Sequence, residues 1–282
     1  MVLNHDSPEN YSVRGSVGSM ATGRPLESVR SGYVLAGGED PVERWYVKFI
    51  RDVLFCGCLC RTDDAMNVLT ETECAYLEEL RLYMEEPFID SNPDHEMLLT
   101  KIWTNAFPQE VLPAAIDIKW TNLGFQSSNP RTDIRTGVHS LLSMEYMSRT
   151  YPLEFRRIVS EAHDPNSEYP FAASCVSISF SLLIFFKLNT KTSVNPSGCA
   201  SGTRYALKQF IRLSMSFPNL FDEIFSRVTM SVHKHWMNQL SVTEKSRFDI
   251  HYFGVALTKG LEGMTYLFNE KRIKHLADLK NI

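Results

Sequence analysis

The 282-residue chain carries 29 lysines and arginines against 33 aspartates and glutamates, and its formal net charge is −4. Both signs are mixed along the chain, which excludes the strongly basic footprint of a nucleic-acid-binding protein, so we expect no nucleic-acid partner. The length suffices for one large domain or two small ones. The amino end has no charged-then-apolar secretory leader, and we expect a cytoplasmic protein.

Residues 1–40 are rich in Ser, Gly, Asn and Pro and show no apolar periodicity. Such a segment buries too little apolar surface to fold, so we expect a disordered tail. Residues 41–66 differ, because apolar residues at helical spacing predict an amphipathic helix from Pro41 to Phe55, followed by a cysteine-rich loop. The apolar stripe of this helix consists of Trp45, Phe49, Ile50, Val53 and Leu54.

The cysteine-rich loop contains Cys56, Cys58 and Cys60. In a chain of this size without a leader, we expect these thiols to be reduced rather than part of a disulfide framework. Three interpretations stay open: unmodified thiols, S-acylation beside an apolar helix, and a metal site. Acylation would give a peripheral association with an internal or plasma membrane. A metal is the weakest interpretation, because the alternate spacing does not match the usual Cys-x2-Cys pair of a zinc site, so we expect no metal.

The first helices after residue 67 have clear start and stop signals. Thr70 and Glu73 form a capping box, in which hydroxyl and carboxylate each satisfy a free backbone N–H. Asn92 before Pro93 is a second helix start, since proline's missing donor costs nothing at the first helical position. Pro108 is expected to stop that helix.

A further helix is predicted from Ala114 to Leu123, with Gly124 as the left-handed residue at its end. A short polar loop follows, and the next helix is expected to open with Arg135 in its first turn. Cations normally stabilise helix C-termini, where they complement the macrodipole. The position of Arg135 therefore suggests a role other than local helix stability.

Later helices are predicted to begin near Pro152, Pro170, Arg204, Pro218 and Thr243. One segment is ambiguous, because Cys175 to Leu182 alternates apolar and polar residues in the manner of a strand. A single strand has no partner to pair with here, and we expect a helix. The fold class is therefore all-α, with residues 67–282 forming one multi-helix domain.

The segment from Trp120 to Arg135 resembles the signature of the ELMO domain, W-x3-G-F-Q-x3-P-x-T-D-F-R. The residues in register are Trp120, Gly124, Phe125, Gln126, Pro130, Thr132, Asp133 and Arg135, while Ile134 replaces the family's Phe. The blocks Pro87–Trp103 and Glu168–Ala172 resemble the same family and stand in the same order. After Arg135 the chain departs from the family's Gly-x-Gly and is one residue shorter, reading Arg135-Thr136-Gly137-Val138.

The resemblance implies an α-helical fold and a role with small GTPases. Stand-alone ELMO-domain proteins are GTPase-activating proteins for Arf and Arl GTPases and need the signature arginine, whereas larger ELMO proteins act with DOCK exchange factors on Rac. The length of this chain favours the stand-alone branch. We expect it to bind a GTP-bound Arf or Arl GTPase and to supply Arg135 in trans. The alternative is a non-catalytic adaptor for a small GTPase or for a trafficking or cytoskeletal partner.

Each signature residue also has a structural interpretation. Arg135 is either a finger for the phosphates or a buried arginine that bridges helix ends. Asp133 either orients Arg135 or caps the next helix, and we favour the cap. Gln126 either makes a structural hydrogen bond or orients the attacking water, and we favour the structural hydrogen bond. Trp120 and Phe125 are expected to be core aromatics. No Gly-rich phosphate loop occurs, so the chain itself is expected to need no nucleotide or other cofactor.

Overall fold

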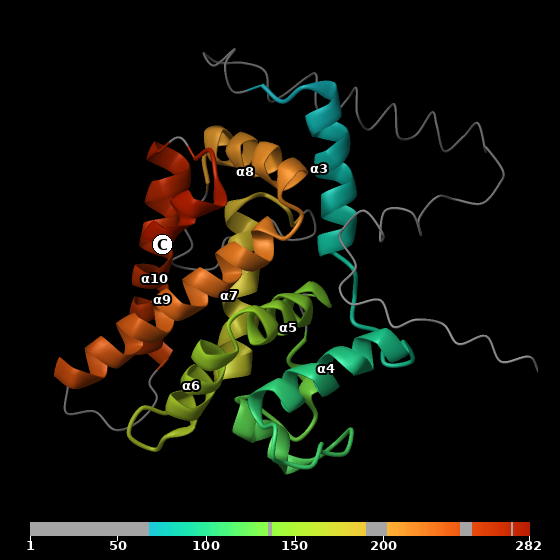
Figure 1. Ribbon diagram of the computed structural model, residues 1–282, viewed down its shortest axis with the longest axis vertical. Coiled ribbons are helices and arrows are strands. Elements are labelled where there is room, and N and C mark those ends of the chain that lie inside the picture. Colours follow the sequence, from blue (N-terminus) through green and yellow to red (C-terminus); the bar gives the residue numbers. More distant parts are fainter. Residues whose placement is uncertain (1–67, 135–136, 190–201, 243–249, 272) are drawn as a thin grey trace, which may run out of the picture. The chain divides into compact units, whose positions relative to one another are not determined.

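The computed structural model describes residues 68–134, 137–189, 202–242, 250–271 and 273–282. Regular structure in these ranges is entirely helical, which confirms the all-α class (Figure 1). The elements are α3 (Glu71–Met84), α4 (Pro93–Ala106), η3 (Ile118–Leu123), η4 (Pro130–Thr132), α5 (His139–Thr150), α6 (Pro152–His163), α7 (Phe171–Phe185), α8 (Arg204–Ser216), α9 (Leu220–Val242), α10 (Ile250–Glu270) and η5 (Leu276–Asn281), where η denotes a 3-10 helix.

Several sequence predictions concern residues outside those described. They are the tail over 1–40, the helix over 41–55, the thiols Cys56, Cys58 and Cys60, the start near Thr243, and Arg135. These remain predictions.

The predicted starts of α3 and α4 are confirmed. Thr70 donates its N–H to Glu73 Oε2 at 2.8 Å, and the Glu73 N–H donates to Thr70 Oγ1 at 3.2 Å. Asn92 accepts the N–H of Asp94 through its side chain, with Pro93 at the first helical position. Each cap satisfies backbone donors that have no partner inside the helix.

The ambiguous segment Cys175 to Leu182 lies within α7, so the helix prediction is confirmed. Twelve of the fifteen α7 residues are buried, as expected for a helix surrounded by others on all sides. The polar positions of the alternation are serines, and two of them, Ser177 and Ser181, satisfy their hydroxyls on carbonyls of the preceding turn, as Ser174 does just before the segment. Ser174, Ser177 and Ser181 donate to the carbonyls four residues before them, at 2.8 to 3.0 Å. None of the described helices is long and apolar enough to cross a bilayer.

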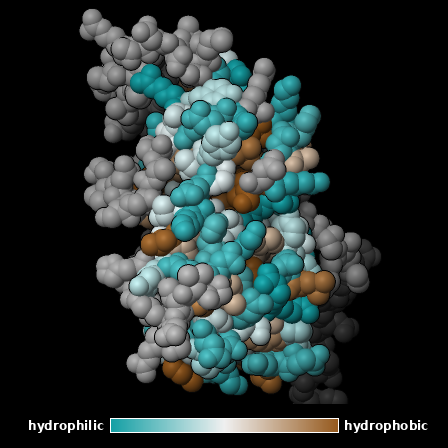
Figure 2. All heavy atoms as spheres, turned by 90° about the vertical axis from the view of Figure 1, so that its left-hand side faces the viewer, coloured by the Kyte–Doolittle hydropathy of each residue, from teal (hydrophilic) through white to brown (hydrophobic). Residues whose placement is uncertain are grey.

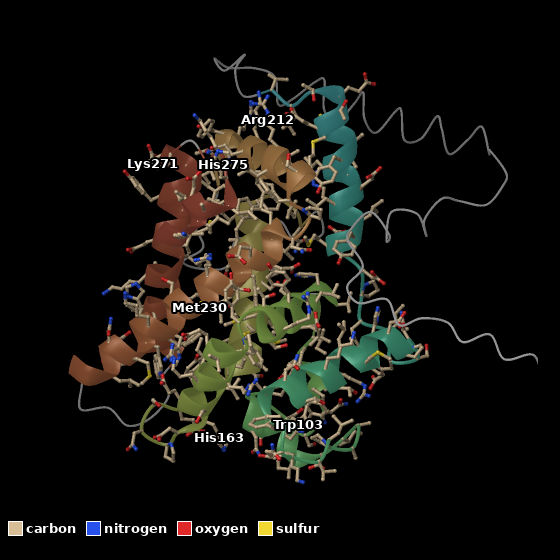
Figure 3. All side chains as sticks on the ribbon, viewed as in Figure 1. Trp103, His163, Arg212, Met230, Lys271 and His275 are labelled. Atoms are coloured by element: carbon tan, nitrogen blue, oxygen red, sulfur yellow. The ribbon has the colours of Figure 1, made fainter. Side chains whose placement is uncertain are left out.

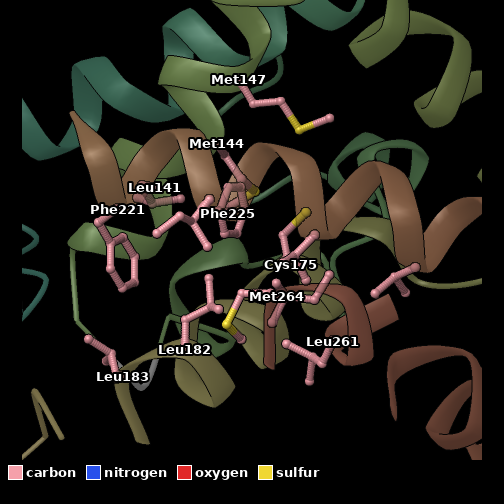
Figure 4. Packing of buried hydrophobic residues seen from close by; sticks show 14 of the residues in the cluster. Leu141, Met144, Met147, Cys175, Leu182, Leu183, Phe221, Phe225, Leu261 and Met264 are labelled. Atoms are coloured by element: carbon pink, nitrogen blue, oxygen red, sulfur yellow. The ribbon is translucent and has the colours of Figure 1, made fainter. Parts of the chain in front are cut away.

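The core lies where α5, α7, α9 and α10 pack together. Figure 4 shows Leu141 of α5, Phe225 of α9 and Met264 of α10 in this cluster. The helices α9 and α10 pack along each other, and Gly260 permits the close approach. A Cβ at Gly260 would lie 2.3 Å from a methyl carbon of Val232 and 2.8 Å from its backbone, so a larger residue would push the two helices apart.

Two predictions around the signature are wrong. The helix expected from Ala114 to Leu123 exists only as η3, from Ile118 onward. Residues 114–117 instead make long-range hydrogen bonds: Ala114 and Ala115 accept from the side chains of Trp120 and Arg131, and the Asp117 N–H donates to the Ser128 carbonyl. These bonds use backbone groups that a helix would need for itself.

The second wrong prediction concerns the helix after the signature. It begins at His139, four residues beyond Arg135, so Arg135 is not in its first turn. Asp133 is not its N-cap either, since Asp133 ends η4 and the residue before α5 is Val138.

Candidate functional site

The signature loop is fixed to the start of α7 through Gly124. This glycine has the predicted left-handed backbone, with φ of 89°. A Cβ there would lie 2.2 Å from the backbone nitrogen of Phe171, and the Gly124 carbonyl accepts the N–H of Ala173 at 3.2 Å. Only glycine fits this conformation and this contact. Two of the three sequence blocks that resemble the ELMO domain therefore meet at this point.

Trp120 and Phe125 are core aromatics, as expected, and each is 3% exposed. Their rings meet edge to face at 6.0 Å, and Trp120 also contacts the ring of Trp103 on α4 at 5.4 Å. The Trp120 Nε1–H donates to the Ala114 carbonyl at 2.9 Å. The aromatic side chains thus anchor both ends of the turn at Gly124 in the core.

Asp133 closes the signature loop. Its Oδ2 accepts the backbone N–H of Gln126 at 2.6 Å, and this bond spans seven residues. This bond is made by the main chain of Gln126, whose side chain is exposed, so the structural hydrogen bond expected of the side-chain amide remains a prediction. Pro130 starts η4 and is buried, and the Thr132 hydroxyl donates to the Asn129 carbonyl at 2.9 Å. The loop is held by its own polar groups, which leaves the Gln126 amide at the surface.

Arg131 takes the structural role that sequence reasoning considered for Arg135. Its Nε donates to Glu96 Oε1 at 2.9 Å, its Nη2 contacts the other oxygen of Glu96, and its Nη1 donates to the Ala115 carbonyl at 2.8 Å. The Arg131 side chain is 16% exposed. It joins α4, the loop before η3 and the signature. No local sequence pattern indicates this role, because Glu96 lies 35 residues away.

The residues on both sides of Arg135 are anchored. Ile134 is 6% exposed, in keeping with an apolar residue at the family's Phe position. On the other side, the Val138 N–H donates to the Glu86 carbonyl at 2.9 Å. Gly137 has φ of 109°, and a Cβ there would lie 2.7 Å from the same carbonyl. Arg135 and Thr136 themselves lie outside the described residues.

A groove of about 320 Å³ runs beside the signature loop. One wall comes from the signature and includes Gln126, and the other comes from the end of α6 and the start of α7. Figure 3 places His163, on the second wall, at the same end of the view as Trp103. Behind this wall the Tyr169 hydroxyl contacts His233 Nδ1 at 3.0 Å, and His233 Nε2 contacts Glu161 at 2.7 Å. This buried chain of side chains stiffens the wall.

Two buried ionisable groups lie in and opposite α5. Burial lowers the pKa of His139 to about 4. The Met84 carbonyl favours the protonated ring, but neither ring nitrogen has a partner of good hydrogen-bond geometry among the described residues, so burial dominates. Burial also raises the pKa of Asp222 to about 6, although the Ser143 hydroxyl donates to it at 2.7 Å. In the described part of the chain, no group of three or more His, Cys, Asp or Glu is placed to hold a metal ion.

Residues 78–251 match the ELMO/CED-12 family. The chain belongs to this family. It is 34% identical over 89 residues to mouse ELMO domain-containing protein 2, a match that covers 31% of this chain and 30% of that protein. It is 29% identical over 161 residues to ELMO domain-containing protein A of Dictyostelium discoideum, covering 53% of this chain and 16% of the other.

ELMO domain-containing protein 1 of Pongo abelii gives a longer match. It is 27% identical over 192 residues, covering 64% of this chain and 55% of that protein. The chain thus spans less than a third of the length of the first relative and about half that of the last. No solved structure matches the chain.

Proposed function

We propose that this ELMO-domain chain accelerates GTP hydrolysis on an Arf- or Arl-family GTPase in its GTP-bound form, with Arg135 supplied in trans. The observation that carries the proposal is that a different arginine of the signature segment, Arg131, already has the structural role. Arg131 uses its guanidinium to hold the loop together, and Ile134 and Val138 anchor the chain on either side of Arg135. Arg135 therefore follows a stabilised loop that already has its own structural arginine.

The chemistry requires a cation at the phosphates of the partner. Charge develops on the transferred phosphoryl group and on the leaving oxygen during GTP hydrolysis, and a guanidinium stabilises that charge with a planar set of donors. An arginine supplied in this way accelerates hydrolysis by about 10³ to 10⁵, which corresponds to roughly 4–7 kcal/mol of barrier. Lysine replaces it poorly because a point charge lacks the bidentate geometry. The chain would act only on its partner and would need no cofactor of its own.

Single-turnover GTP hydrolysis across a panel of Arf and Arl GTPases tests the proposal. We expect acceleration by the native chain, loss of nearly all of it in Arg135→Ala, and little recovery in Arg135→Lys. Arg149→Ala is the matched control, because Arg149 is an exposed arginine near the end of α5 and should leave the rate unchanged. If the native chain accelerates no GTPase on the panel, the proposal is wrong.

A non-catalytic adaptor for a small GTPase or a trafficking partner is the second candidate. The segment after Arg135, which is one residue shorter than the family pattern, favours it, because an arginine finger has to reach the nucleotide at a set position. Binding of a GTP-loaded GTPase without any acceleration of hydrolysis would support the adaptor.

We also propose that the protein works in the cytoplasm and associates peripherally with an internal or plasma membrane through acylation of Cys56, Cys58 and Cys60. These thiols follow a predicted apolar helix, and one acyl chain together with a second signal gives stable anchoring. A palmitate-exchange assay on the full chain, with serine at all three positions as control, tests this idea. Equal labelling of the native and serine chains would refute it.

A further inference from the structure

The end of the loop that follows α4, together with the first residue of η3, exposes apolar side chains beside the signature. We call residues 111–118 the apolar loop. Its exposed members are Val111 at 80%, Leu112 at 44%, Ile116 at 65% and Ile118 at 69%. Four of the eight residues in this segment are thus apolar and exposed to solvent. Figure 2 shows a largely hydrophilic face on which hydrophobic side chains are scattered, some of them at its lower edge. Exposed apolar residues gathered in this way mark interaction sites.

The apolar loop is held in place. Pro113 is buried within it. Ala114 accepts the indole N–H of Trp120 at 2.9 Å, and Ala115 accepts Nη1 of Arg131 at 2.8 Å. The Asp117 N–H donates to the Ser128 carbonyl at 2.9 Å. A partner that binds such a fixed loop loses little free energy to ordering it, which favours tight binding.

All three partners of these bonds belong to the signature segment. The apolar loop therefore lies directly against residues 120–131 of the signature segment. Arg131 is the clearest link, because the same guanidinium holds the signature to α4 and supports Ala115. A partner that binds the signature segment at Ser128 and Arg131 would also reach the apolar loop.

The charges around the loop favour a protein over a membrane. Glu110 and Asp117 are negative and Lys119 is positive, so residues 110–119 carry a net charge of −1. A loop that inserts into an anionic leaflet needs nearby cations, each worth about 1 kcal/mol at the surface. An apolar patch on a folded partner has no such requirement.

From these observations we infer that the apolar loop is the docking contact for the small GTPase, and that its isoleucines enter an apolar patch on that partner. The inference rests on the proposed function for the identity of the partner. It assigns binding to the apolar loop and acceleration to Arg135.

The test uses the full chain with Ile116→Gln and Ile118→Gln combined. The matched control is Leu82→Gln, because Leu82 on α3 is 75% exposed and equally free of packing. Binding to the Arf and Arl panel loaded with a non-hydrolysable GTP analogue is measured by titration. We expect roughly 30-fold weaker binding for the double variant and none of this loss for the control. Thermal unfolding should be unchanged in both, since these side chains are exposed.

The outcomes separate the two ideas. In hydrolysis assays the double variant should raise the concentration for half-maximal acceleration and keep the rate at saturation, whereas Arg135→Ala should lower the rate at saturation and keep the half-maximal concentration. Binding without acceleration, still weakened by the double variant, would support the docking contact and refute the GTPase-activating function. Native-like binding by the double variant, or no binding by the native chain, would overturn the docking contact. The docking contact would also be overturned if the native chain bound phosphatidylcholine–phosphatidylserine vesicles and the double variant did not.

Discussion

Replacing Arg131 by alanine should destabilise the fold, and replacing Arg135 should not. Arg131→Ala removes two contacts to Glu96 and one to the Ala115 carbonyl. Hydrogen bonds to charged groups contribute about 1.5–3 kcal/mol when buried. The Glu96 side chain is 35% exposed, so we discount its pair to about 1 kcal/mol and assign a similar amount to the carbonyl. With the lost packing of the side chain, the free energy of unfolding should fall by about 2–3 kcal/mol.

Urea denaturation followed by tryptophan fluorescence measures this effect, because Trp103 and Trp120 lie in the core next to the loop. A double-mutant cycle with Glu96→Gln should give a coupling of about 1 kcal/mol between the two side chains. At about 2–4 °C per kcal/mol for a domain of this size, the melting temperature of Arg131→Ala should drop by roughly 4–12 °C.

The comparison with Arg135→Ala decides the assignment of the two arginines. We expect that variant to unfold within about 0.5 kcal/mol of the native chain, as surface substitutions usually do. If Arg135→Ala were as unstable as Arg131→Ala, Arg135 would be a buried structural arginine and the finger hypothesis would fail. If Arg131→Ala were as stable as the native chain, the structural role of Arg131 would be wrong.

Two further predictions concern the loop and α5. Gly124→Ala should lower the free energy of unfolding by more than about 3 kcal/mol, because the new Cβ would sit on a left-handed backbone and overlap the backbone of Phe171. If this variant melted at the same temperature as the native chain, the close contact between Gly124 and Phe171 would be wrong. The pKa of His139 is about 4 in the folded chain and near 6.5 when unfolded, so at this residue the unfolded state binds more protons and the contribution of His139 to stability falls as pH drops from about 6.5 to 4. Asp222, whose pKa is raised to about 6, contributes in the opposite sense over this range. His139→Leu should remove the contribution of His139, so the free energy of unfolding should change with pH by up to about 3 kcal/mol less than in the native chain. Urea denaturation at a series of pH values measures this. If the pH dependence of the free energy of unfolding were the same in both chains, His139 would not be its source.

Features that depend only on neighbouring residues could be predicted from the sequence. The capping box of Thr70 and Glu73, the left-handed turn at Gly124 and the buried aromatic Trp120 were all predictable. Caps and turns work over three or four residues, so a local pattern suffices. Helix α7 was predictable despite its alternating sequence, because a lone strand would have had no partner.

Tertiary structure alone decided the arrangement around the signature. The segment before Ile118 is not helical because its carbonyls accept from Trp120 and Arg131, and α5 starts at His139 rather than at Arg135. Arg131 acquired its role from Glu96, which is distant in sequence and adjacent only after folding. Hydrogen bonds between distant segments depend on how helices pack, and no local periodicity encodes them.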